Sequence, residues 1–227
     1  MNPDVLDAFS AENPIRKLYD RSIRLAQEGQ FDNVNKRMRF YGLHQLVQHA
    51  ITKFPHLDLM ECGCWLGHST LILSSLMQEA GATGRLHVFD SFEGLSRFTE
   101  SDLSEFWTTD AERARIQMHF KSDFDKMKAL VSPFGFVDLH KGWIPEVFDG
   151  ATVGTIGFAS VDVDLHDPTR SSIEFLYPRL VPGGVMYFDD YAYKDFPGAK
   201  KAVDDHLRKN PPAFFLEGPA GSAFLIK

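Results

Sequence analysis

The chain has 227 residues, with 24 Lys or Arg against 31 Asp or Glu, so its formal net charge is −7. This length fits one α/β domain with a real hydrophobic core, since such domains often reach about 250 residues. The acidic balance argues against nucleic acid and anionic membranes as binding partners, because both need clustered Lys and Arg.

The N-terminus and the cysteines indicate a cytoplasmic protein. Residues 1–14 carry acids and no apolar run, so we expect no signal peptide. The apolar stretches are far shorter than the ~20 residues that span a bilayer. Cys62 and Cys64 are separated by one residue, which would strain a mutual disulfide, and zinc-site spacing is absent. We expect free thiols that act as small buried hydrophobes in a reducing compartment.

Hydrophobic spacing predicts the elements in chain order. Residues 1–34 look peripheral, with Asn13-Pro14 as a breaker, and a helix is expected over 35–54, ended by Pro55. Strands are then expected at 57–62, 85–90, 136–140, 156–162 and 185–188. Helices are expected at 68–80 and at 197–209. A further helix should begin after Asp167 as its N-cap, with Pro168 as its first residue. The last two strands, 213–217 and 223–227, have no helix between them.

The alternation of buried strands with helices predicts a Rossmann-like α/β fold. We expect a seven-stranded, mostly parallel sheet with helices on both faces and a C-terminal antiparallel hairpin, the layout of class I methyltransferases. One domain should cover 1–227, with a helical extension over 1–55 and an insertion over 91–135. Such a long connection is typically functional, and its aromatic residues suit a lid over an acceptor pocket. A surface excursion with short helices is the alternative.

Glycines and acids follow the first two predicted strands, where open parallel sheets bind ligands. The loop in Glu61–Thr70 (ECGCWLGHST) has the pattern E-x-G-x-x-x-G and lacks the third glycine that pyrophosphate recognition normally needs. It therefore favours S-adenosylmethionine (SAM) over a dinucleotide. Asp90 ends the second strand, where a carboxylate can accept hydrogen bonds from both ribose hydroxyls. A tight turn without a ligand, and a capping role for Asp90, are the alternatives.

Four carboxylates end two further strands. Asp162 and Asp164 follow one strand, and Asp189 and Asp190 follow its expected neighbour. Together they would repel one another unless protons or a cation intervene. Mg²⁺ or another hard divalent cation suits carboxylate oxygens, so the pattern predicts a metal site.

These motifs together resemble the macrocin O-methyltransferase (TylF/MycF) family of class I SAM-dependent methyltransferases. The resemblance covers about residues 35–209 and is carried by Glu61-Cys62-Gly63, Asp90–Leu95, Lys141-Gly142-Trp143, Asp162–Leu165, Asp189-Asp190-Tyr191 and Pro197-Gly198. The family contains metal-dependent enzymes that methylate sugars of macrolides and aminocoumarins. The resemblance implies that Glu61, Gly63 and Asp90 hold SAM, that Asp162, Asp189 and Asp190 bind the cation, and that Asp164 is the general base.

Further contacts are expected around this site. Cofactor contacts should also come from Cys64, Gly67, Ser69, Ser91, Gly142, Trp143 and Asp162, although Trp143 could equally be a core residue. His166 stands where the family more often has an aromatic phenol. It could contact substrate or share the proton transfer, or it could simply be a polar residue at a helix entry.

The sequence thus predicts a divalent-metal-dependent O-methyltransferase that moves the methyl group of SAM to a hydroxyl of a small molecule. The expected acceptor is a sugar or polyol of a natural product, and a catechol or phenol would satisfy the same geometry. A metal-dependent hydrolase would use the Asp cluster but leave Glu61–Gly67 and Asp90 without a role. A SAM-binding protein without activity is a further alternative. The N-terminal segment could serve contacts in a homodimer or cover the site.

Overall fold

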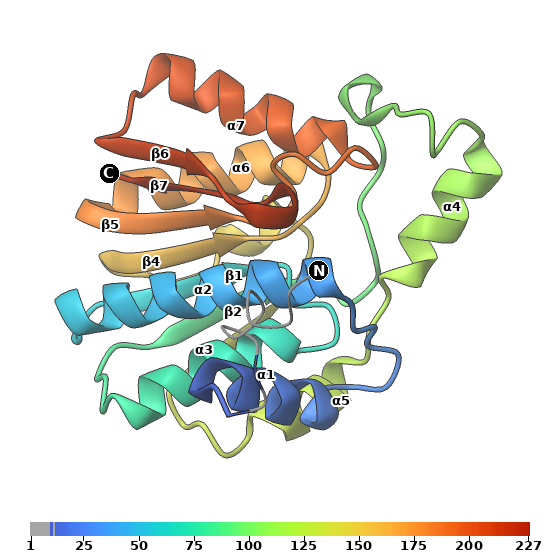
Figure 1. The fold of residues 1–227 in the computed structure, drawn as a ribbon. Coiled ribbons are helices and arrows are strands. Elements are labelled where there is room, and N and C mark those ends of the chain that lie inside the picture. The colour runs from blue at the N-terminus through green and yellow to red at the C-terminus, as the bar shows by residue number, and fades with distance from the viewer. Residues whose placement is uncertain (1–9, 11) are drawn as a thin grey trace.

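A seven-stranded sheet between two layers of helices forms the protein, as the computed structural model of residues 10 and 12–227 shows (Figure 1). The strands are β1 (Asp58–Cys62), β2 (Leu86–Asp90), β3 (Val137–Lys141), β4 (Ile156–Val161), β5 (Leu180–Phe188), β6 (Phe214–Glu217) and β7 (Ala223–Ile226). Their order is β3-β2-β1-β4-β5-β7-β6; the first five are parallel, and β7 pairs antiparallel with β5 and β6. The predicted fold class, including the terminal hairpin, is confirmed.

Helices cover both faces of this sheet (Figure 1). The helices are α1 (Pro14–Leu25), α2 (Val34–Lys53), α3 (His68–Glu79), α4 (Asp110–His119), α5 (Phe124–Val131), α6 (His166–Leu176) and α7 (Pro197–Lys209). One core joins α1, α2, α3 and α5 to the sheet, and a second core joins α6 and α7 to the opposite face. Because β4 is buried at every position, it reads as a continuous apolar run, as central parallel strands do.

Strand β5 begins earlier than predicted. Pro182-Gly183-Gly184 looks like a turn in the sequence, but the strand starts at Leu180, which pairs with Ile156 of β4. The register between β4 and β5 shifts just after Ile156, so the Pro-Gly-Gly step is accommodated as an irregularity within the strand.

Two helix starts also differ from expectation. Asn13-Pro14 does not merely break the chain: the Asn13 side chain accepts from Ile15 N at 2.9 Å and Pro14 opens α1. The predicted N-cap at Asp167 is wrong, because α6 begins at His166 and its N-cap, Leu165, has no capping side chain. The cap comes from a distant residue, since His166 N donates to the Asp102 carboxylate at 2.7 Å.

The 91–135 segment divides into two parts. Helix α5 belongs to the core, where Met127 and Val131 are buried, whereas α4 has no buried residue and projects from the side of the molecule (Figure 1). The aromatic residues divide differently: Phe92, which precedes α4, packs on Phe124 in the core, with ring centroids 4.9 Å apart, whereas Trp107 and Phe120 both lie against Phe196. Trp107 and Phe120 are therefore the aromatic residues that can face a ligand.

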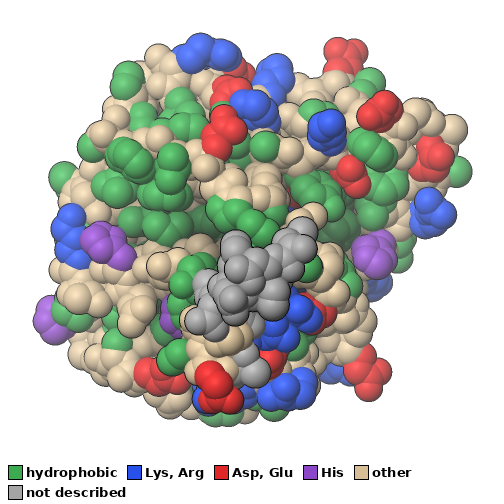
Figure 2. Space-filling view, viewed as in Figure 1, with side chains coloured by type: hydrophobic (Ala, Val, Ile, Leu, Met, Phe, Trp, Pro, Cys, Tyr) green, Lys and Arg blue, Asp and Glu red, His purple; other side chains and the backbone are tan. Residues whose placement is uncertain are grey.

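The state of the cysteines and the distribution of surface charge agree with what the composition led us to expect. Cys62 and Cys64 are buried and free, as predicted. On the face that Figure 2 shows, basic side chains are interspersed with acidic ones rather than gathered in one patch. No helix in the described part of the chain is long and apolar enough to cross a membrane.

Gly198 near the start of α7 offers a test of the packing around Asp102. A Cβ at Gly198 would lie 1.9 Å from Asp102 Oδ1 and 2.9 Å from His166 N. We expect Gly198→Ala to lower the free energy of unfolding by about 1–3 kcal/mol, because the buried carboxylate must shift. Gly42→Ala in α2 is the matched control: among the described residues, no atom beyond the backbone of its own helix lies within 4 Å of the added Cβ, so stability should rise by about 0.5–1 kcal/mol. Urea unfolding measures both, and similar losses for the two variants would contradict the packing.

Candidate active site

The loop between β1 and α3 closes tightly over the ends of the strands. Gly63 has φ +83°, and a Cβ on it would lie 1.7 Å from the carbonyl oxygen of Asp162, so only glycine fits. The Asp90 carboxylate holds this loop from the next strand. It accepts hydrogen bonds from the backbone N–H groups of Cys64 (2.8 Å), Trp65 (3.0 Å) and Phe92 (2.7 Å).

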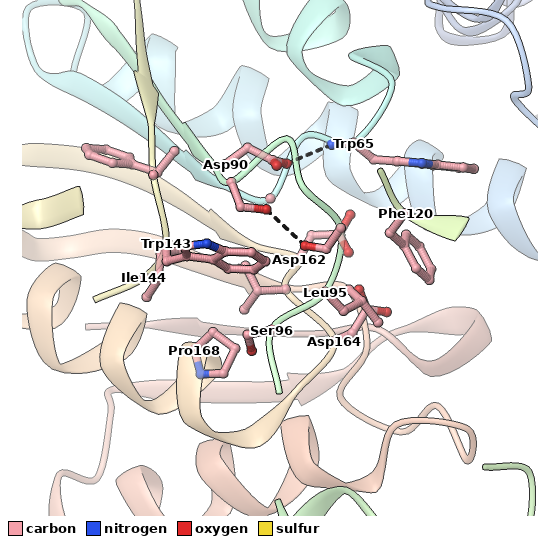
Figure 3. Close-up of a pocket in the computed structure, with 16 residues that line it drawn as sticks. Trp65, Asp90, Leu95, Ser96, Phe120, Trp143, Ile144, Asp162, Asp164 and Pro168 are labelled. Carbon is pink, nitrogen blue, oxygen red and sulfur yellow. Dashed lines mark hydrogen bonds between the residues drawn. The ribbon is translucent and has the colours of Figure 1, made fainter. Parts of the chain in front are cut away.

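A first cavity opens beside this loop, with an empty volume of about 670 Å³. Figure 3 shows Asp90 and Asp162 on its wall, with the Trp143 ring on one side and Trp65 and Phe120 on the other. Its walls also include Gly63, Ser91, Gly94, Leu95, Gly142, Ile144, Asp164 and Pro168. A carboxylate at the end of β2, glycine backbone and an indole ring together suit a nucleoside.

Carboxylates meet at the end of β4. One oxygen each from Asp162, Asp164 and Asp190 lie within 4.8 Å of one another. Asp164 has φ +59° in a tight turn where Leu165 N donates to the carbonyl of Val163. Such a conformation is costly for a residue other than glycine and is typical of functional sites.

Burial and mutual repulsion act on these acids together. Burial, followed by the charges of Asp189 and Asp190, raises the pKa of Asp162 and of Asp164 well above the usual range. Burial, followed by the charge of Asp189, raises the pKa of Asp190 to about 7. Asp190 Oδ2 is buried and has no hydrogen-bond partner among the described residues. The acids of the cluster therefore cannot all be ionised at once unless a further cation offsets their repulsion.

Arg39 of α2 is the cation closest to this charge. Its guanidinium lies 2.6 Å from Asp189 Oδ2 and 3.8 Å from Asp190 Oδ1. Although burial opposes its charge, the carboxylates of Asp189 and Asp190 raise the pKa of Arg39. Asp189 also accepts a hydrogen bond from the Tyr187 hydroxyl at 3.1 Å. Asp189 is thus already paired, whereas Asp190 keeps a free oxygen.

A second cavity adjoins the first and shares Trp65, Phe120, Asp162 and Asp164 with it. Its other walls come from α2, the start of α3, the 91–123 segment and the region after β5, and include Lys36, Arg39, Phe40, Cys64, His68, Ser69, Trp107, Asp189, Asp190, Tyr193 and Phe196. The two cavities therefore meet at the carboxylate cluster, as a donor pocket and an acceptor pocket would.

Comparison with known proteins agrees with this geometry. The profile of the macrocin O-methyltransferase (TylF) family matches residues 33–211. The chain belongs to this family. The chain is 30% identical over 176 residues to the 8-demethyl-8-(2,3-dimethoxy-α-L-rhamnosyl)-tetracenomycin-C 4′-O-methyltransferase of Streptomyces olivaceus, covering 74% of this chain and 64% of that one. It thus spans less than two thirds of that relative's length.

Two further comparisons extend the likeness. Mycinamicin III 3″-O-methyltransferase of Micromonospora griseorubida is 26% identical over 177 residues, covering 74% of this chain and 67% of that protein. The structure of the O-methyltransferase NovP superposes with a TM-score of 0.73 at 18% identity, covering 94% of this chain and 99% of NovP. The likeness to NovP concerns the fold alone.

Most of the predicted site residues of this TylF family member lie around the two cavities. Gly63, Asp90, Ser91, Gly142, Trp143 and Asp162 line the first cavity, and Cys64, Ser69, Asp189 and Asp190 line the second. Asp164 lines both. The carboxylate oxygens that converge are those of Asp162, Asp164 and Asp190, whereas the predicted metal set has Asp189 in place of Asp164.

Three predicted residues line neither cavity. Glu61 is fully buried, and its carboxylate accepts a hydrogen bond from the hydroxyl of Thr70, which ties β1 to α3. Gly67 is the N-cap of α3, and a Cβ on it would lie 2.6 Å from Leu130. His166 contacts Asp167 through Nδ1 at 2.8 Å, and its Nε2 is buried without a hydrogen-bond partner among the described residues.

Sequence patterns missed three residues that shape the site. Lys36 and Arg39 lie on one face of α2, but the sequence shows only a basic helix start. Asp102 caps α6 from 64 residues away. Trp107, by contrast, belongs to the aromatic segment that we expected to cover an acceptor pocket, and it lines the second cavity. The sequence hinted at Asp102 only in that it is a carboxylate within the aromatic 91–135 segment.

Glu61 allows a test of the buried charge at the end of β1. Burial raises the pKa of Glu61 from 4.5 to about 7. Its folded-state pKa exceeds the unfolded one, so the folded chain binds more protons and its stability falls as pH rises through about 7. Glu61→Gln removes this titration. The unfolding free energy of the variant relative to the wild type should rise by about 2 kcal/mol from pH 5 to pH 8. Urea unfolding across that range measures it, and a difference that does not change with pH would contradict the assignment.

Proposed function

We propose that this protein is a SAM-dependent O-methyltransferase that methylates a hydroxyl of a sugar on a natural product. The observation that carries the proposal is the junction of the two cavities at Asp162 and Asp164. A methyl donor in the first cavity and an acceptor in the second would meet beside a carboxylate. Membership in the TylF family supports the same reaction.

The donor fits the first cavity. Asp90 would accept a hydrogen bond from the ribose, since each carboxylate oxygen has two lone pairs and its backbone bonds leave acceptor capacity. Trp143 and Ile144, on the wall of the same cavity, would pack on the adenine. SAM would supply an electrophilic methyl group, which the walls would have to hold in line with the acceptor oxygen.

The carboxylate cluster suits a divalent cation. The Arg39 guanidinium pairs with Asp189, whereas oxygens of Asp162, Asp164 and Asp190 converge and Asp190 Oδ2 has no hydrogen-bond partner in the described chain, so the donor set fits a hard cation. Asp162, Asp189 and Asp190 would hold it. When bound, such a cation stabilises the forming alkoxide and orients the acceptor oxygen. Asp164, which lines both cavities beside these carboxylates, would accept the hydroxyl proton.

The second cavity suits a sugar. Its rings offer apolar faces, and the buried indole N–H groups of Trp65 and Trp107 have no hydrogen-bond partner among the described residues. Such donors match the hydroxyls of a ring with apolar C–H faces. The Streptomyces olivaceus relative carries a rhamnosyl group in the name of its acceptor. A deoxysugar on a natural product is therefore the acceptor that we propose.

Methyl transfer to a rhamnosylated polyketide in the presence of SAM tests the proposal by mass spectrometry. We expect a product heavier by one methylene, formation of S-adenosylhomocysteine (SAH), loss of activity in EDTA and recovery with Mg²⁺. Full activity in EDTA would remove the metal role. Phosphoester hydrolysis without SAM would favour the hydrolase instead.

Asp164→Asn is the control for the base in this assay. The variant should lower kcat by roughly 10²- to 10⁴-fold and leave the Kd of SAM within about twofold, because an amide cannot take the proton. Glu174→Gln, on the exposed side of α6, should leave kcat unchanged. Near-normal kcat in Asp164→Asn would assign the base elsewhere.

A further inference from the structure

Lys36 is a buried ammonium that lacks a carboxylate partner. Its residue is 4% exposed, and Nζ donates to Gln30 Oε1 at 2.5 Å and to the carbonyl of Phe31 at 3.3 Å. None of residues 10 and 12–227 forms an ion pair with it, whereas the next residue, Arg37, pairs with Asp32. Burying an ammonium whose hydrogen-bond partners are neutral costs free energy, and an anion bound at Nζ would recover part of that cost.

Carboxylates act on this ammonium from a distance only: the charges of Asp162, Asp189 and Asp32 favour its protonated form, but none of the three forms an ion pair with it. Nζ lies 4.8 Å from the ring centroid of Phe31 and 5.4 Å from that of Phe40. Burial lowers the pKa of Lys36 to about 8. An anion at Nζ would reverse that effect and use the third donor of the ammonium.

Lys36 lies where the methionyl end of SAM would be expected. Lys36 lines the second cavity together with Cys64, His68 and Ser69, at the start of α3. The N-cap of α3, Gly67, has no side-chain cap, so the positive end of the helix dipole faces the same place. His68 does not compete as a cation, because burial, and then Lys36, lower its pKa to about 3.

The three substituents on the SAM sulfur indicate which anion would lie at Lys36. With the adenosyl arm in the first cavity and the methyl group directed at Asp164, the aminopropyl arm must leave the shared wall into the second cavity. There, Asp189 and Asp190 repel a carboxylate at one end, and Lys36 with the start of α3 attracts it at the other.

We propose that the Lys36 ammonium, with the N-terminus of α3, binds the α-carboxylate of the methionyl moiety of SAM. Lys36 is then a binding residue for the donor that none of the sequence motifs contains. The inference rests on the proposed function, since it takes SAM as the donor.

Calorimetry with two ligands tests the assignment. The ligands are SAH and its decarboxylated analogue, 5′-deoxy-5′-(3-aminopropylthio)adenosine, which differ in the carboxylate alone. Lys36→Met keeps an unbranched stem between the two phenylalanine rings and removes the charge. We expect it to weaken SAH binding roughly 10- to 100-fold and to change the Kd of the analogue by less than about twofold.

Two further variants complete the design. Lys53→Met removes an exposed lysine from the same helix and should leave both ligands unaffected. Lys36→Arg keeps the charge and should retain SAH affinity within about fivefold. This variant still tests the role of the charge if Lys36→Met fails to fold.

The outcomes separate the inference from the function. Equal weakening of both ligands by Lys36→Met, or no weakening of either, overturns the role of Lys36 while leaving the methyltransferase proposal in place. Unchanged SAH binding with a raised KM for the acceptor would also overturn it, because Lys36 would then serve an anionic acceptor. Failure of the wild type to bind SAH would overturn the proposed function itself.

Discussion

The site depends on holding like charges close together inside the protein. Asp162, Asp164 and Asp190 bring carboxylate oxygens within 4.8 Å of one another, and Asp189 stands beside them with Arg39 as its partner. Repulsion between such groups must be offset, and protonation, a guanidinium and a cation are the available means. Through Arg39, α2, which precedes the whole sheet in the chain, reaches the carboxylates that follow β5. The extension before β1 is thus part of the site.

The turn that carries Asp164 is held from two sides. Its left-handed backbone at Asp164 is followed directly by α6, whose first N–H is capped by Asp102. The Asp102 carboxylate is fully buried, accepts from Thr99, and lies against Gly198 at the start of α7. The buried Asp102 carboxylate therefore accepts a hydrogen bond from the first residue of α6 and lies close to the first turn of α7. Through this contact the segment that supplies Trp107 to the acceptor cavity is fixed to the turn that supplies the proposed base.

Local patterns were enough to predict what depends on local chemistry. The apolar runs of β1, β2 and β4, the glycines at 63 and 67, and the acids that end the strands follow from strand burial and turn sterics, and their convergence follows from a parallel sheet. The cap of α6, the pairing of Arg39 with Asp189 and the position of Lys36 depend on residues that meet only after folding. Asp90 was predicted only in part. Its place at the end of β2 follows from the sequence, whereas its hydrogen bonds to the backbone of the glycine loop do not.

The central claim is that the buried carboxylates are held together to bind a divalent cation where the two cavities meet. Crystals grown with SAH and Mn²⁺, measured at the manganese absorption edge, test it most directly. We predict one strong anomalous peak per chain within bonding distance of Asp162 and Asp190, which disappears in Asp190→Asn. A peak elsewhere, or none at these carboxylates with SAH in place, would contradict the account.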